Sequence, residues 1–133
     1  MLTANHMSTL FSKIISGEIP SYKIYEDEQT YAFLTIRPHA KGHTLVVPKI
    51  EVDHWDDVPE DYFNHMWRTA QFVAKVMKEK LQCSRVCVMV VGFEVPHAHI
   101  HLIPSESMAD LDIHKAYDAT KEELEEMHAK LTS

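Results

Sequence analysis

Apolar residues alternate with polar ones, or cluster in short runs, along five stretches of the chain, and each stretch predicts a β-strand. The predicted strands are residues 22–25, 30–36, 43–47, 85–91 and 97–103. Residues 85–91 are apolar on both faces, a pattern typical of a central strand.

A repeat of apolar residues every three or four positions predicts a long helix over residues 59–82. Pro59 suits its first position. Shorter helices are predicted over residues 10–15 and 120–131, and the second begins with a capping box between Thr120 and Glu123 and is expected to pack at the periphery. The stripe of the long helix should pack against the sheet through Phe63, Met66, Trp67, Ala70, Val73, Ala74, Met77 and Leu81.

The order of these elements predicts an α+β fold with a five-stranded antiparallel sheet. A length of 133 residues is enough for one domain with its own hydrophobic core. We expect this domain to span residues 7–133. Residues 1–6 look like an expression remnant, because the segment from Met7 reads as a natural start.

Composition and charge narrow the class of partner. The chain has 13 Lys and Arg against 20 Asp and Glu, a net charge of −7, which disfavours binding to a nucleic-acid polymer. No apolar run approaches the ~20 residues of a membrane helix, and no secretion signal is evident. Cys83 and Cys87 match no zinc pattern and lie too far apart for a disulfide if both are on one strand, so we expect reduced thiols and a cytoplasmic location.

Three histidines carry the candidate chemistry. His97, His99 and His101 alternate with apolar residues, so a strand would place all three imidazoles on one face. Such a row can supply a nucleophile, a proton donor and hydrogen bonds to an anion. The strict alternation disfavours an inert surface. A metal site stays open, because two of these histidines could share an ion, although no carboxylate or cysteine stands at a recognisable spacing.

The segment 96–104, Pro-His-Ala-His-Ile-His-Leu-Ile-Pro, fits every position of the signature His-φ-His-φ-His-φ-φ, with φ apolar, and so resembles the histidine triad (HIT) family. Segments 10–20 and 42–49 are similar to the family's opening and third strand. The resemblance looks closest to the Hint-like branch, in a short-loop bacterial form. It implies a HIT-like fold whose sheet continues across a homodimer, and a hydrolase or nucleotidyl transferase that cleaves purine nucleoside phosphoramidates at the α-phosphate.

The resemblance also implies a role for each histidine. His99 matches the nucleophile that forms a nucleotidyl-histidine. His101 matches the histidine that hydrogen-bonds the phosphate. His97 and His43 are expected to orient His99 and relay protons. Five other histidines are expected to be surface or structural residues: His39, His54, His65, His114 and His128.

The nucleotide is expected at the positions where the family holds the base and ribose, although most of these residues suit a core equally well. They are Leu10, Phe11, Ile14, Phe33, Thr35, Ile36 and Glu94. Thr35 stands where the family usually has an aspartate that grips both ribose hydroxyls. A threonine offers one hydroxyl there, so weaker ribose binding is expected. Val91 and Phe93 replace polar residues of the family, which puts efficiency and leaving-group choice in doubt.

Some relatives hold a structural zinc through an N-terminal Cys-x-x-Cys and a histidine after the third strand. Thr9, Ser12 and Glu51 occupy these positions here. Hydroxyls are poor zinc ligands beside thiolates, so neither a metal nor another cofactor is expected.

Other functions stay open from the sequence. Hydrolysis of dinucleoside polyphosphates, as in the Fhit-like branch, needs room and positive charge for a second nucleotide. Nucleotide binding with little turnover is kept open by the substitutions at Thr35, Val91 and Phe93. A metal-binding module is the remaining alternative.

Overall fold

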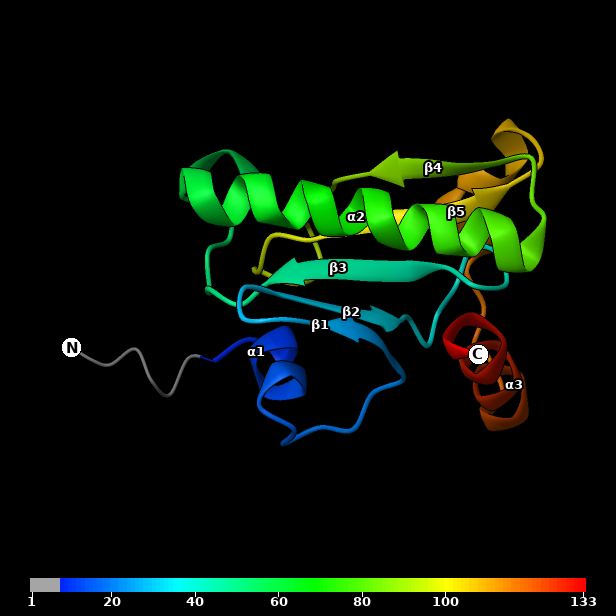
Figure 1. Ribbon diagram of the computed structural model, residues 1–133, viewed down its shortest axis with the longest axis horizontal. Coiled ribbons are helices and arrows are strands. Elements are labelled where there is room, and N and C mark those ends of the chain that lie inside the picture. The colour runs from blue at the N-terminus through cyan, green and yellow to red at the C-terminus, as the bar shows by residue number, and fades with distance from the viewer. Residues whose placement is uncertain (1–7) are drawn as a thin grey trace.

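The computed structural model of the protein describes residues 8–133, and the expected remnant at residues 1–6 lies outside them (Figure 1). The described residues contain no helix long and apolar enough to cross a membrane. Five strands and three α-helices form the fold, with short 3₁₀ turns at η2, η3 and η4. In chain order they are α1 (Leu10–Ile15), β1 (Lys23–Glu26), β2 (Thr30–Leu34), β3 (Thr44–Pro48), η2 (Trp55–Asp57), α2 (Glu60–Leu81), β4 (Arg85–Met89), β5 (Ile100–Ser105), η3 (Met108–Leu111), η4 (Ile113–Lys115) and α3 (Lys121–Thr132).

The sheet is antiparallel throughout and has the strand order β1-β2-β3-β5-β4. The predicted α+β fold is therefore confirmed. The central position predicted for residues 85–91 is wrong, because β4 lies at the edge of the sheet. Its apolar residues on both faces do not reflect burial on both sides, since Val88 is 49% exposed.

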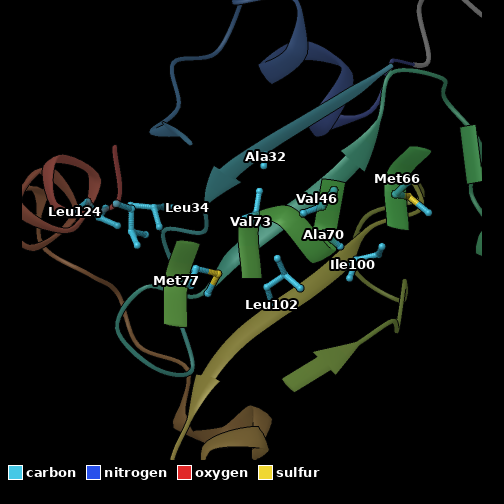
Figure 2. Close-up of a cluster of buried hydrophobic side chains, with 11 residues drawn as sticks. Ala32, Leu34, Val46, Met66, Ala70, Val73, Met77, Ile100, Leu102 and Leu124 are labelled. Atoms are coloured by element: carbon cyan, nitrogen blue, oxygen red, sulfur yellow. The ribbon is translucent and has the colours of Figure 1, made fainter. Parts of the chain in front are cut away.

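The long helix α2 covers one face of the sheet (Figures 1 and 2). Alternation along the strands sends every second apolar side chain towards it. From α2 itself, the residues buried in this core are Met66, Ala70, Val73 and Met77. The other half of the predicted stripe, including Phe63 and Trp67, is only half-buried.

The opposite face of the sheet carries a second, smaller apolar cluster with α1. Phe11 and Ile14 of α1 pack there against the other side chains of β2 and β3, namely Tyr31, Phe33, Leu45 and Val47. In β5, His101 lies directly opposite Leu45 of β3, and cross-strand partners point to the same face. The histidine side of β5 therefore faces α1, while Ile100 and Leu102 face α2.

The C-terminal helix α3 is more deeply involved in packing than its weak periodicity predicts. Leu124 and Leu131 are 7% and 4% exposed and belong to the main core. Thr120 caps the helix by accepting the backbone N–H of Glu123 through its hydroxyl, at 3.1 Å. α3 thus closes one end of the core beside α2 rather than lying on its outside.

Candidate active site

The candidate site lies along the antiparallel pair β3 and β5, two neighbouring strands in the middle of the sheet (Figure 1), where His101 lies opposite Leu45 and His43 directly precedes β3. His101 is in β5, whereas His97 and His99 precede its first residue, Ile100. The strand predicted over residues 97–103 therefore begins three residues late. The reason is that Ala98 donates its backbone N–H to the carbonyl of Val52, in the loop after β3, rather than to a strand, at 2.7 Å.

His99 is held in one tautomer by the main chain. Its Nδ1 lies 2.7 Å from the carbonyl oxygen of His97, which can only accept, so Nδ1 carries the proton and Nε2 keeps a free electron pair. The ring is 6% exposed and packs edge-on against Phe11, with the ring centroids 4.9 Å apart. The ring of His101 is 4.8 Å away. His99 thus presents an Nε2 with a free electron pair beside a second imidazole.

His101 is oriented by a chain of hydrogen bonds that starts in the loop before β3. The backbone N–H of His39 donates to Nδ1 of His43 at 3.0 Å. The proton of His43 is therefore on Nε2, which donates to Nδ1 of His101 at 3.0 Å. His101 in turn carries its own proton on Nε2, where it can be donated to an anion.

His97 and His43 contact the other two histidines through different groups. The expectation that both orient His99 and relay protons stays a prediction. The ring of His43 contacts His101, and His97 holds His99 through its main-chain carbonyl. The ring of His97, which is 0% exposed, is hydrogen-bonded to the carbonyl of Pro48 and the hydroxyl of Thr9.

Burial keeps these imidazoles neutral. It lowers the pKa of His99 below its ordinary value, and the hydrogen bond to His97 only partly offsets the effect. Burial lowers the pKa of His43 to about 3 and that of His101 to about 4, and the neighbouring histidines add to both shifts. At neutral pH the site therefore presents uncharged imidazoles, the form in which an imidazole can act as a nucleophile.

His39 is a site residue that the sequence pattern missed. Its ring lies 4.9 Å from that of His43 and is nearly parallel to that of His101, at 17° and 6.5 Å. It lies in a loop, where no periodicity marks a shared face. Two other histidines have structural partners, since His65 bonds to Asp27 and His128 to the carbonyl of Lys23, while His54 and His114 are exposed.

The residues of the predicted nucleotide pocket are partly buried in the core and partly exposed at the surface. Three of its residues are buried in the α1 cluster, with exposures of 4% for Phe11, 8% for Ile14 and 4% for Phe33. Leu10 and Ile36 are 47% and 65% exposed and lie at the surface.

The two polar residues of that predicted pocket differ in setting. The hydroxyl of Thr35 accepts the backbone N–H of Arg37 at 3.2 Å, and its own N–H bonds to the carbonyl of His43. Glu94 is exposed on the loop before the histidines, close enough for its charge to oppose the lowering of the His99 pKa. The backbone of Thr35 is therefore bonded to that of His43, the residue that orients His101.

A cleft of about 520 Å³ also reaches His99. It runs between the segment at η2 and the loop that follows β4. Its exposed aromatic residues, Trp55 and Phe93, were not recognised as neighbours from the sequence, because 38 positions separate them. The lining residues are Asp53, His54, Trp55, Val90, Val91, Gly92, Phe93, Pro96, Ala98 and His99.

The three positions at which some relatives hold zinc come together here as well. The Oε1 atom of Glu51 accepts the Ser12 hydroxyl at 2.6 Å and the Thr9 N–H at 3.1 Å. Hydrogen bonding from Ser12 is the main reason that the pKa of Glu51 lies below its ordinary value. Within residues 8–133, no group of three or more His, Cys, Asp or Glu side chains is arranged to hold a metal ion.

Comparison with known proteins agrees with this geometry. Residues 16–108 match the family model of the HIT domain. A HIT-like protein of Methanocaldococcus jannaschii is 42% identical over 100 residues, covering 71% of this chain and 77% of that protein. The adenosine 5′-monophosphoramidase of Candida albicans is 34% identical over 139 residues, covering 96% and 91%. The crystal structure of a Hit-like protein from Bartonella henselae aligns with a TM-score of 0.83 and 31% identity over 99% of this chain and 98% of that one. The fold, the histidine geometry and these similarities together show that the chain belongs to the HIT family.

Proposed function

We propose that the protein hydrolyses purine nucleoside 5′-phosphoramidates at the α-phosphorus, with His99 as the nucleophile. The observation that carries this proposal is the tautomer of His99, whose Nδ1–H is fixed by the His97 carbonyl at 2.7 Å so that Nε2 is free to attack. The 34% identity to a monophosphoramidase supports the same reaction class.

The reaction takes place in two displacements. In the first, Nε2 of His99 forms a bond to phosphorus while the P–N bond of the substrate breaks. The electron pair stays on the departing nitrogen, which takes a proton from solvent. In the second, a water oxygen attacks phosphorus, the P–Nε2 bond breaks, and one proton of the water returns to solvent. The products are a nucleoside monophosphate and an amine.

The neighbouring histidines stabilise charge in both steps. The Nε2–H of His101 donates to a non-bridging phosphoryl oxygen, and it is available because His43 occupies the other ring nitrogen. Preorganised donors of this kind act strongly in a buried site, where water does not compete. Phosphorylated His99 keeps its Nδ1–H on the His97 carbonyl, so the ring does not rotate between the two steps.

We assign the nucleoside and the leaving amine to different sides of His99. The nucleoside lies on the α1 side, where Phe11 contacts His99 and Ile36 is exposed. The amine lies in the cleft beside Trp55, whose lining includes His99. The cleft is open to solvent, which supplies the proton and the water.

Incubation with adenosine 5′-phosphoramidate tests the proposal. We expect release of AMP and, after acid or rapid quench, an adenylate adduct on the peptide that contains His99. His99→Ala should lose both, by at least ~10³-fold in kcat, because the nucleophile is absent. His114→Ala is the matched control, since His114 is an exposed histidine that does not line the cleft at His99, and it should retain both.

Three results would contradict the proposal. Turnover in His99→Ala equal to that of the wild type would show that another group attacks. AMP binding without turnover or adduct would indicate a nucleotide-binding protein, the alternative that Thr35 supports because it supplies a single hydroxyl for the ribose. Faster cleavage of a dinucleoside polyphosphate than of the phosphoramidate would favour the Fhit-like reaction.

We further propose a homodimer that forms through the free edge of β4. Val88 of this strand is 49% exposed, and the outer edge of β4 pairs with no strand within residues 8–133. An apolar open edge is suited to pairing with a second copy. Light scattering should give twice the chain mass, and Val88→Glu should give the monomer. A monomeric wild-type protein would refute the proposal.

A further inference from the structure

Three polar side chains connect the N-terminus of α1 to the histidine segment. We call Thr9, Ser12 and Glu51 the N-terminal clasp. The Thr9 hydroxyl lies 2.8 Å from Nδ1 of His97 and accepts the backbone N–H of Ser12 at 3.0 Å. Glu51, in the loop after β3, accepts the Ser12 hydroxyl and the Thr9 N–H. The clasp therefore ties together three segments that are distant in the sequence.

The direction of the central hydrogen bond follows from its surroundings. Nε2 of His97 lies 3.0 Å from the carbonyl of Pro48, so this nitrogen carries the proton of the neutral ring. Nδ1 is then an acceptor, and the hydroxyl of Thr9 donates to it. Thr9 and His97 are 7% and 0% exposed, so water cannot readily replace this bond. Without the hydroxyl, a buried ring nitrogen would be left without a partner.

The clasp is connected to His99 through two other residues, His97 and Phe11. Through His97, it fixes the residue whose carbonyl oxygen holds Nδ1 of His99. Through α1, it fixes Phe11, which follows Thr9 by two positions and packs against both histidine rings, at 4.9 Å from His99 and 5.8 Å from His97. The position of His99 is therefore set by Thr9 from two directions.

We propose that Thr9, Ser12 and Glu51 are positioning residues for His99, a hydrogen-bonded clasp that aligns Nε2 with the α-phosphorus. This inference rests on the proposed function of His99. The clasp does not touch the substrate. It acts through the ring and carbonyl of His97 and through the packing of Phe11.

Capping alone would be a purely structural role, and the chain offers a control for it. Thr120 caps α3 with the same geometry, its hydroxyl accepting the N–H of the residue three positions later at 3.1 Å. It has no hydrogen bond to a histidine of the site. Thr120→Val therefore removes a cap from the fold, whereas Thr9→Val removes a cap and the hydrogen bond to His97.

The experiment compares kcat and KM for adenosine 5′-phosphoramidate in these variants. Thr9→Val should lower kcat by about 10- to 100-fold with KM changed by less than about 3-fold, since small misplacements of a reacting group are costly while the nucleoside contacts persist. Thr9→Ser keeps the hydroxyl and should stay within about 3-fold of the wild type. Thr120→Val should lower the thermal midpoint, by less than Thr9→Val because only the cap is lost, and should leave kcat unchanged.

The acceptor of the clasp is tested in the same way. Glu51→Gln keeps an oxygen that accepts the Ser12 hydroxyl, and should retain most of the activity. Glu51→Ala removes this oxygen and should lower kcat towards the value of the Thr9→Val variant. Equal kcat values for Thr9→Val, Thr9→Ser and the wild type would overturn the inference. Equal losses of kcat in Thr9→Val and Thr120→Val would also overturn it.

A spectroscopic readout separates this inference from the proposed function. Nitrogen-15 NMR reports the tautomer of each imidazole. In Thr9→Val, the Nδ1 resonance of His97 should lose its hydrogen-bonded shift, and the two nitrogens of His99 should move towards a mixture of tautomers. If the wild-type protein releases no AMP from any phosphoramidate, the proposed function fails. An unchanged His99 spectrum in Thr9→Val refutes the clasp in either case.

Discussion

Replacement of Gly42 by alanine tests how closely the elements around the site are packed. Gly42 immediately precedes His43 and has a φ of +94°. A Cβ at this position would lie 2.7 Å from Cδ1 of Leu81, 3.4 Å from Cγ of Pro104 and 3.5 Å from Sδ of Met127. These atoms belong to α2, β5 and α3, so one methyl group would press on three elements at once.

The expected cost has two parts. A positive φ costs a non-glycine residue of order 1–2 kcal/mol. Overpacking a close-packed site adds about 1–3 kcal/mol, less if the end of Leu81 can rotate away. Gly42→Ala should therefore lower the free energy of unfolding by roughly 2–5 kcal/mol. Gly17 has a φ of +85° but no atom within 4 Å of the place that a Cβ would take, so Gly17→Ala isolates the first part.

Urea denaturation at equilibrium measures the loss of unfolding free energy in Gly42→Ala and in Gly17→Ala, provided that the m-values of the variants agree. The loss in Gly42→Ala should exceed that in Gly17→Ala by about 1–3 kcal/mol. Leu81→Ala should recover part of this difference in the double variant, because it removes the closest contact. Equal losses at the two glycines, or no recovery with Leu81→Ala, would refute the packing argument.

Three further predictions concern the buried polar groups. The free energy of unfolding should fall as the pH drops below 6.5, by about 2 kcal/mol per histidine at pH 5. The folded-state pKa values of His43 and His101 are about 3 and 4, so the unfolded chain binds protons first. Urea denaturation midpoints at pH 7 and pH 5 measure this loss, and equal midpoints would contradict it. His43→Phe should reduce kcat by ~10²-fold or more, because His101 loses the donor that fixes its tautomer, and a rate equal to that of the wild type would remove His43 from the mechanism. Thr69→Val should lower the free energy of unfolding, measured by urea denaturation, by about 1 kcal/mol, because the buried hydroxyl of Thr30 loses its bond to Thr69 at 2.9 Å and keeps only the one to Asp27; no change would show that the lost bond contributes nothing net.

The sequence predicted most elements of the fold because their periodicity is strong. The apolar stripe of α2 predicted the long helix, and the short apolar runs of β2 and β3 predicted these strands. The place of β4 could not be predicted in the same way. An apolar run looks alike whether a strand lies in the middle of a sheet or at an edge that another surface covers, and only the pairing with β5 distinguishes them.

The candidate site shows the same division. Alternation was enough to single out His97, His99 and His101, and their roles stay predictions. Their partners come from loops, where a residue's neighbours depend on the tertiary fold rather than on spacing. His39 and Thr9 are examples, since His39 packs on two rings of the site and Thr9 reaches His97 from 88 positions away.

The pairing of β3 with β5 has a consequence for how the protein folds. His43 and His101 are 58 positions apart, and the whole of α2 and β4 lies between them. Closing a loop of this length costs chain entropy before any contact in the site is gained, and contacts of long sequence separation slow folding. We therefore expect helical structure to return early in refolding and enzymatic activity to return late, because the histidines meet only when the two central strands have paired.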